Sequence, residues 1–143
     1  MQDIGDIEIV EITAENQSLM NNIADDLFDK PVQSRLLKSF LAEKTHWLVA
    51  AVLDGLVVGK TTAMVHRRPD KEDELYLDEI DVIPDLRRKG IAKMMLRKIL
   101  EMADARGCEE CWLGTEKDNI PARKLYESNG AKPEEFVLYY LEY

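Results

Sequence analysis

The stretch Pro84-Asp85-Leu86-Arg87-Arg88-Lys89-Gly90-Ile91-Ala92 decides the fold, because a strand-like apolar run ends there and a long helical pattern begins. Main-chain N–H groups converge in such a turn, a helix N-terminus adds partial positive charge, and a glycine lets an anion approach the backbone. Basic side chains at a helix start oppose the helix dipole, so a merely solvated loop is the weaker interpretation. The stretch therefore predicts a binding site for a pyrophosphate-like anion.

The segments on either side form a strand, helix, strand unit. Residues 75–83 are the first strand, which Pro84 ends by removing a ladder donor. Apolar residues then recur at helical spacing over residues 90–106, with Gly107 as a C-terminal stop. A second strand over residues 111–115 is expected to run parallel to the first, joined by a right-handed crossover.

The rest of the chain extends this unit to one sheet flanked by helices. A first strand near residues 7–9 precedes two predicted helices, one capped by Thr13 with the apolar pattern Leu19, Ile23, Leu27, and one with Pro31 in its first turn. Residues 47–53 and 56–65 form a hairpin around Asp54-Gly55, a short helix capped by Asp118 and Asn119 ends at Gly130, and residues 136–141 form a last strand. The predicted order is β-α-α-β-β-β-α-β-α-β, a mixed α/β fold.

Composition limits the function classes. The 143 residues, 45% of them hydrophobic, suit one domain over residues 1–143. A net charge of −9 opposes binding to nucleic acid and favours cationic partners. No apolar run reaches the roughly 20 residues of a membrane helix, and residues 1–6 carry two acids where a signal peptide is basic, so we expect a cytoplasmic protein that does not bind membranes.

The only two cysteines, Cys108 and Cys111, form a single C-x-x-C pair. A zinc site would need two further ligands, and both histidines lie far upstream, so we expect no metal. A redox pair normally opens a helix, whereas this pair follows Gly107 and enters a strand-like run. Two reduced cysteines at a strand entrance are the expected outcome.

Two motifs resemble one family. Arg87-x-x-Gly90-x-Ala92, after Asp81-Val82-Ile83-Pro84, resembles the acyl-CoA pyrophosphate loop of the GNAT N-acetyltransferase superfamily, and residues 119–130 are similar to its second signature. The order of elements agrees along nearly the whole chain. A looser resemblance, carried by residues 26–29, 48–51, 57–59 and 75–90, is to the aminoglycoside 3-N-acetyltransferase branch, whereas residues 67–73 and 136–143 depart from that pattern.

The resemblance implies acetyl-CoA as co-substrate and direct transfer of its acetyl group to a primary amine in a ternary complex. The implied cofactor contacts are the loop residues Arg87, Arg88, Lys89, Gly90, Ile91 and Ala92, the strand residues Ile80, Asp81, Val82 and Ile83, and Asn119 and Tyr126 from the second signature. The strand residues would act through main-chain groups that pair with the pantetheine arm as an added strand does.

An amine must lose a proton before it attacks a thioester, so a carboxylate on the neighbouring strand is the expected base. The resemblance assigns this role to Glu79, and Asp81 is the second candidate for the base. By alternation these two residues share one face, while Ile80 and Val82 share the core face. Crowding of the two acids is expected to raise the pKa of one of them. The alternative is that both are exposed strand acids screened by solvent.

Tyr126 is the candidate general acid for the departing thiolate, and the alternative is a core tyrosine on the stripe of Ala122 and Leu125. The expected substrate is an aminoglycoside-type polycation, attracted by the acids Asp25, Asp26, Asp29, Glu134 and Glu135. Acetylation of a protein amine or a polyamine, and a non-catalytic acyl-CoA sensor, stay open as alternatives. The sequence also leaves open whether the chain forms a homodimer.

Overall fold

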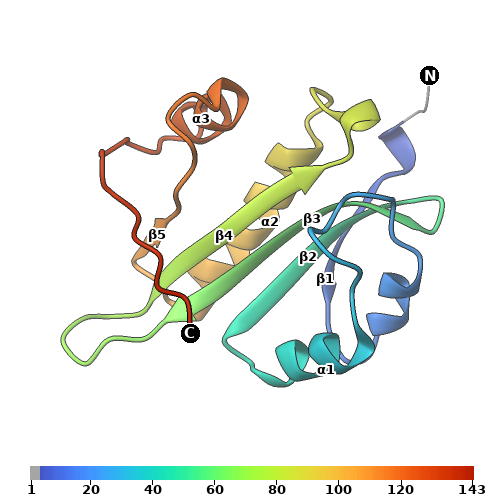
Figure 1. Cartoon of the computed structure of the whole chain (residues 1–143), viewed down its shortest axis with the longest axis horizontal. Coiled ribbons are helices and arrows are strands. Elements are labelled where there is room, and N and C mark those ends of the chain that lie inside the picture. Colours follow the sequence, from blue (N-terminus) through green and yellow to red (C-terminus); the bar gives the residue numbers. More distant parts are fainter. Residues whose placement is uncertain (1–3) are drawn as a thin grey trace. The chain divides into compact units, whose positions relative to one another are not determined.

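A computed structural model describes residues 4–143, so residues 1–3 of the acidic N-terminal segment lie outside the description. The described chain divides into two compact units, one that ends at Leu113 and one that covers Gly114–Tyr143. The first unit contains short 3₁₀ turns at Ile4–Asp6, Gln17–Asn21 and Pro84–Leu86, strands β1 (Glu8–Ile12), β2 (His46–Leu53), β3 (Leu56–His66), β4 (Glu74–Val82) and β5 (Glu110–Trp112), and helices α1 (Ser34–Ala42) and α2 (Ile91–Arg106). The second unit contains α3 (Ile120–Ser128) (Figure 1). A single domain over residues 1–143 stays a prediction.

The five strands form one mixed sheet in the order β1-β2-β3-β4-β5. The first three pairings are antiparallel and the β4–β5 pairing is parallel, which confirms the predicted mixed α/β architecture. The β2–β3 hairpin turns at Asp54 (φ 50°) and Gly55 (φ 78°). Positive φ at both central residues is the type I′ geometry that matches the twist of the flanking strands.

The sheet is covered on both faces. Helix α2 packs against β2, β3 and β4 (Figure 1), and the Met95 side chain comes so near Gly59 that a Cβ built there would lie 3.0 Å from Met95 Cε. The opposite face carries a second apolar cluster to which α1 and residues 19–28 contribute. Its buried members are Ile12, Met20, Leu27, Leu48, Ala50, Val52 and Val57.

A β-bulge in β4 decides which side chains face α2. Ala63 pairs with Leu77, but Thr62 pairs with Glu79, so Asp78 has no partner in the β3–β4 ladder. Directly paired residues of an antiparallel ladder point to the same face. The inserted residue therefore shifts the alternation: Leu77 lies on the α2 face, whereas Glu79 lies on the opposite face.

The helices differ from the prediction mainly at their starts. Helix α1 begins at Ser34, beyond Pro31. Helix α2 lies between Gly90 and Gly107, as the pattern predicts, and both glycines have the left-handed backbone conformation. Helix α3 is capped by Asn119, whose Oδ1 accepts from the Ala122 N–H (3.3 Å). Within residues 4–143, no helix combines the length and the apolar character needed to cross a bilayer.

Two predicted elements are wrong. The helix predicted after Thr13 is only the 3₁₀ turn Gln17–Asn21, because Asn16 bonds the backbone at Thr13 and Glu11 and because residues 22–24 pair with Val57 of β3. The strand predicted over residues 136–141 is irregular and exposed. A strand needs a partner, and the second unit, Gly114–Tyr143, contains no other strand among its residues. Strand β5 is also shorter than the predicted residues 111–115.

Candidate active site

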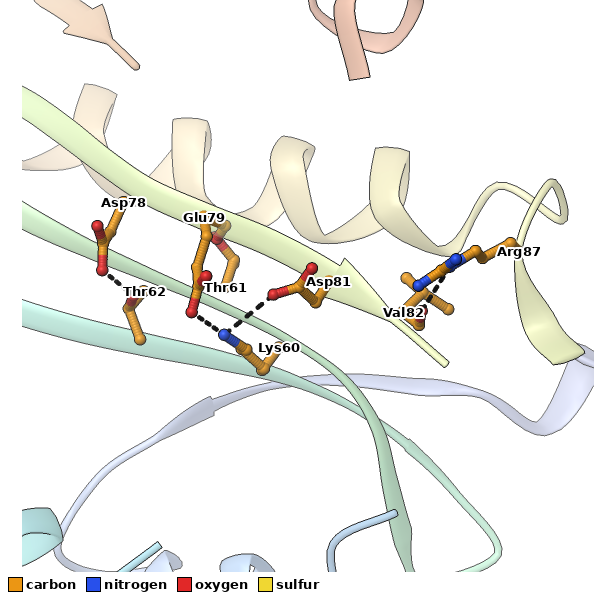
Figure 2. Close-up of polar contacts among 8 residues, drawn as sticks. All are labelled: Lys60, Thr61, Thr62, Asp78, Glu79, Asp81, Val82 and Arg87. Atoms are coloured by element: carbon orange, nitrogen blue, oxygen red, sulfur yellow. Dashed lines mark hydrogen bonds and ion pairs between the residues drawn. The ribbon is translucent and has the colours of Figure 1, made fainter. Parts of the chain in front are cut away.

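The loop after β4 is fixed to the strand that it leaves. The Leu86 side chain is buried, its N–H donates to Ile83 O (3.0 Å), and the Arg87 N–H donates to Pro84 O (3.3 Å). The Arg87 Nε donates to Val82 O at 3.0 Å, which Figure 2 shows at the end of the strand. Arg87 thus contributes to the shape of the loop as well as to its charge.

The loop delivers main-chain donors to the start of α2. Gly90 (φ 86°) is the N-cap residue, and Arg88 adopts a left-handed conformation (φ 63°) that is costly for a residue with a Cβ. The Met94 N–H donates to Gly90 O, and the preceding N–H groups of the first turn have no partner inside the helix. The first turn of this fully described helix contains no acidic residue. The arrangement fits an anion, with Arg88 and Lys89 adjacent.

Strand β4 has an open edge next to this loop. Among residues 4–143, β5 pairs only with Glu74, Leu75 and Tyr76 of β4, so the rest of the strand has no paired strand on that side. The Ile83 N–H donates to Val58 O of β3 (3.0 Å), which occupies that donor. Because alternate residues of an antiparallel strand point their main-chain groups to opposite sides, Ile80 and Val82 direct theirs to the open edge, and Asp81 directs its own to β3.

The open edge fits an extended amide chain such as pantetheine through the main-chain groups of Ile80 and the N–H of Val82, whose carbonyl already accepts from Arg87 Nε. Of the strand residues expected to contact a cofactor, Asp81 directs its main-chain groups to β3. Ile83 has both of its main-chain groups engaged, the N–H with Val58 O and the carbonyl with the Leu86 N–H. Asp81 retains its side chain for the site.

The acids of β4 meet a buried cation. Figure 2 shows the Lys60 ammonium between Glu79 and Asp81, forming an ion pair with Glu79 Oε1 and lying 3.1 Å from Asp81 Oδ2. The Lys60 side chain is 2% exposed, whereas each carboxylate side chain is 44% exposed. Asp78, the residue at the bulge, instead accepts from the Thr62 hydroxyl (3.3 Å). Glu79 and Asp81 therefore share a face, as predicted, but a cation separates their charges.

Sequence reasoning missed Lys60. The expectation that like-charge crowding governs Glu79 and Asp81 left out the ammonium directly opposite Asp81 in the β3–β4 ladder. The signal that could have found it is a single lysine in an apolar and β-branched strand segment, because a buried lysine needs a carboxylate partner.

The second unit holds the other predicted site residues. Tyr126 is half-buried on α3, as are Ala122 and Leu125 of its stripe, and Asn119 caps the helix. The roles of Tyr126 and Asn119 beside a cofactor stay predictions. Glu134 and Glu135 are exposed, and Glu135 Oε1 lies 2.8 Å from Lys117 Nζ, which partly neutralises it.

Three of the predicted entrance acids lie in the first unit, in a segment that contacts Lys60 through Phe28. Asp25, Asp26 and Asp29 are exposed, and the segment between them places the Phe28 ring 4.8 Å from Lys60 Nζ. The structure thus joins this acidic segment to the Glu79–Asp81 pair through Lys60.

The cysteines do not form a reactive centre. Both are free thiols, and burial raises the pKa of Cys111 to about 11, with a smaller contribution from neighbouring Cys108. Burial also raises the pKa of Cys108. Because the thiolate is the nucleophile, neither residue is suited to carry an acetyl group near neutral pH. Within residues 4–143, no group of three or more His, Cys, Asp or Glu side chains is arranged to hold a metal ion.

Known proteins are similar to this chain in sequence over part of its length, and in fold. The chain is 41% identical over 80 residues to N-acetylaspartate synthetase of Homo sapiens, a match that covers 56% of this chain and 26% of that protein. It is 26% identical over 94 residues to aminoglycoside N(6')-acetyltransferase type 1 of Salmonella typhimurium, covering 63% of this chain and 65% of the relative. The chain thus spans about a quarter of the first relative and less than two thirds of the second.

A solved structure of AAC(6')-Iy, in complex with the bisubstrate analogue CoA-S-monomethyl-acetylneamine, has a TM-score of 0.78 to this chain at 19% identity, covering 96% of this chain and 98% of that one. At this identity the likeness concerns the fold. Both aminoglycoside relatives are named for the 6' position, so the narrower resemblance to the 3-N branch stays a prediction. The profile of the Acetyltransferase (GNAT) family matches residues 11–131. Because that match covers most of the chain, including the open edge of β4 and the loop before α2, this protein belongs to the GNAT acetyltransferase family.

Proposed function

We propose that this protein transfers the acetyl group of acetyl-CoA directly to a primary amine of a small cationic molecule. The observation that supports this most is the position of the open edge of β4 directly before an anion-binding helix start. An extended amide chain fits the edge at Ile80 and Val82, and a pyrophosphate fits the main-chain donors near Gly90. The similar fold of AAC(6')-Iy, whose structure was solved in complex with a CoA-containing bisubstrate analogue, supports the same cofactor.

The proposed chemistry uses one residue as a base for the amine and another as an acid for the thiolate. Bound acetyl-CoA supplies the activated acetyl group. Glu79, directly or through a water, takes the proton from the attacking amine as the N–C bond forms, with Asp81 beside it. A main-chain N–H of Ile80 or Val82 polarises the acetyl carbonyl. Tyr126 donates its hydroxyl proton to sulfur as the C–S bond breaks, and no covalent enzyme intermediate forms.

The proposed acceptor carries several ammonium groups, as an aminoglycoside does. Glu79 and Asp81 remain partly exposed, and the exposed acids Asp25, Asp26 and Asp29 lie in the segment that contacts Lys60 through Phe28. Their negative potentials add and attract a polycation. Names of the relatives support this class, because two of them act on aminoglycosides.

We further propose that the protein works in the cytoplasm. We also propose that it binds neither nucleic acid nor membranes, because its net charge of −9 opposes association with phosphate-rich surfaces. The proposal does not depend on a homodimer. Light scattering of the purified chain measures the oligomeric state directly.

The test is release of free CoA from acetyl-CoA in the presence of three acceptor classes: aminoglycosides, polyamines and peptide N-termini. We expect turnover with an aminoglycoside and much less with an uncharged peptide amine. Turnover only with peptides would replace the substrate class and keep the enzyme class. Binding of acetyl-CoA without CoA release for any amine would instead identify a non-catalytic acyl-CoA sensor.

A further inference from the structure

Lys60 is enclosed by charge and by an aromatic ring. Its ammonium contacts Glu79 Oε1, lies 3.1 Å from Asp81 Oδ2, and lies 4.8 Å from the centre of the Phe28 ring. The residue is 1% exposed and stands on β3, on the face opposite α2. Each direction in which the ammonium could donate is thus met by a carboxylate or by a π-face.

Burying a charged lysine in this way costs folding free energy. A buried ammonium loses its hydration, and two ion pairs offset that cost only when their geometry is good. Replacing the lysine and its partners by apolar residues is often neutral or stabilising in proteins. The acids at this place are also half-exposed, so they would remain hydrated without Lys60.

The charges of the cluster sum to −1, from two carboxylates and one ammonium. Glu79 Oε1 and Asp81 Oδ2 are engaged by Lys60, and the half-exposed carboxylates keep their other oxygens for a ligand. One ammonium group of a substrate would therefore complete the neutralisation of the cluster.

We infer that Lys60 is a positioning residue for the acceptor amine: it fixes the orientation of Glu79 and Asp81 and limits their joint charge to one uncompensated negative charge. This inference rests on the proposed function and deepens it. Phe28 contacts the same ammonium from the segment that carries the exposed acids Asp25, Asp26 and Asp29.

The test compares Lys60→Met, which keeps the length of the side chain and removes its charge, with Lys60→Arg, which keeps the charge. The control is Lys38→Met, which removes one charge from the exposed surface of α1. In Lys60→Met we expect kcat to fall on the order of 100-fold, the scale for a misplaced reacting group. The KM for the cationic amine should stay equal or fall, because the cluster becomes more negative, and the KM for acetyl-CoA should not change. Lys60→Arg should recover part of kcat, and Lys38→Met should resemble the wild type.

A merely structural role predicts a different pattern: a lower melting temperature with kcat and both KM values worsening together. That pattern, or a kcat of Lys60→Met within twofold of Lys38→Met, would overturn the inference. If Lys60→Met does not fold, Phe28→Leu removes the ring contact and keeps an apolar side chain there. For Phe28→Leu we then expect a smaller fall in kcat, again without a rise in either KM. The absence of this fall overturns the inference.

Failure of the proposed function is distinguishable, because it would leave the wild type without CoA release for any amine. Calorimetric titration with spermidine then measures how tightly the cluster binds a polycation, and it does not require turnover. Binding should be severalfold tighter in Lys60→Met than in Lys38→Met if Lys60 limits the charge of the site. Equal binding in the two variants would overturn the inference.

Discussion

At the scale of single residues, Lys60 determines the net charge around the acid pair on β4. Two carboxylates two residues apart on one strand face repel each other, and that repulsion is the effect that the sequence suggests. The ammonium between them turns the pair into a cluster with one net negative charge. This contact joins residues of β3 and β4 that are far apart in the sequence, so the residue spacing within β4 alone does not reveal it.

Tyr126 tests whether α3 contributes to the chemistry. Tyr126→Phe removes only the hydroxyl, so turnover is expected to fall by roughly 10²- to 10⁴-fold, the usual contribution of a positioned acid. Affinity for acetyl-CoA should remain nearly unchanged, as measured by calorimetry beside initial rates. Ser128→Ala, on the exposed side of the same helix, is the matched control. Wild-type turnover in Tyr126→Phe would leave this tyrosine with a packing role.

Cys111 gives a prediction on pH. Burial disfavours its thiolate and raises its pKa to about 11, so alkylation by iodoacetamide should be slow at pH 8 and should accelerate as pH rises toward 11. In the urea-unfolded chain the thiol should have its ordinary pKa of 9.0, so its alkylation should already be faster at pH 8. Rapid labelling of Cys111 in the folded protein at neutral pH would contradict the buried thiol.

At the scale of elements, the bulge in β4 explains a change that is visible in the sequence. Leu75 and Leu77 are apolar at odd positions, whereas Ile80 and Val82 are apolar at even positions. Strict alternation would place one of these pairs on the wrong face, and the unpaired Asp78 restores both to the α2 face. The faces of Glu79 and Asp81 could thus be predicted, although the device that produces them could not.

The loop before α2 gives a prediction at this scale. Arg88 has φ 63°, so Arg88→Gly relieves strain in the folded state, while the greater freedom of glycine in the unfolded chain offsets a similar amount, about 1 kcal/mol. Stability should therefore change little, and affinity for acetyl-CoA should fall about 10- to 100-fold if the guanidinium binds phosphate. Urea unfolding and calorimetry measure the two quantities.

Arg88→Asn is the matched control for that loop, because asparagine tolerates the left-handed conformation without supplying a charge. It should bind acetyl-CoA as weakly as Arg88→Gly does. Undiminished affinity in both variants would assign the anion site to main-chain groups, Arg87 and Lys89.

Elements with strong local signals could be predicted, and elements that depend on partners could not. The Asp54-Gly55 hairpin and α2 between two glycines carry their own turn and cap chemistry, and both are confirmed. The helix predicted after Thr13 fails because the Asn16 side chain and β3 compete for its backbone. The apolar residues of 136–141 favour a strand, but Gly114–Tyr143 contains no other strand with which they could pair inside the second unit.

At the scale of the whole molecule, the net charge of −9 gives a prediction on salt. The Debye length falls from roughly 10 Å at 0.1 M to about 3 Å at 1 M, so attraction between exposed acids and a polycation weakens. The KM for an aminoglycoside or spermidine should therefore rise steeply with ionic strength. An uncharged peptide amine, assayed in the same salt series, serves as the control and should show little change. A KM for the polycations that is indifferent to salt would reject the cationic substrate class and leave acetyl transfer intact.

The central claim is direct transfer of an acetyl group from acetyl-CoA to an amine, and mass spectrometry of a single reaction mixture tests it most directly. The account predicts acetylated amine and free CoA in equal amounts at every time, with no initial burst of CoA and no acetyl group on the protein. Acetylated protein that forms before the acetylated amine would contradict direct transfer. Acetyl-CoA left intact beside every amine of the three acceptor classes would contradict the claim as a whole.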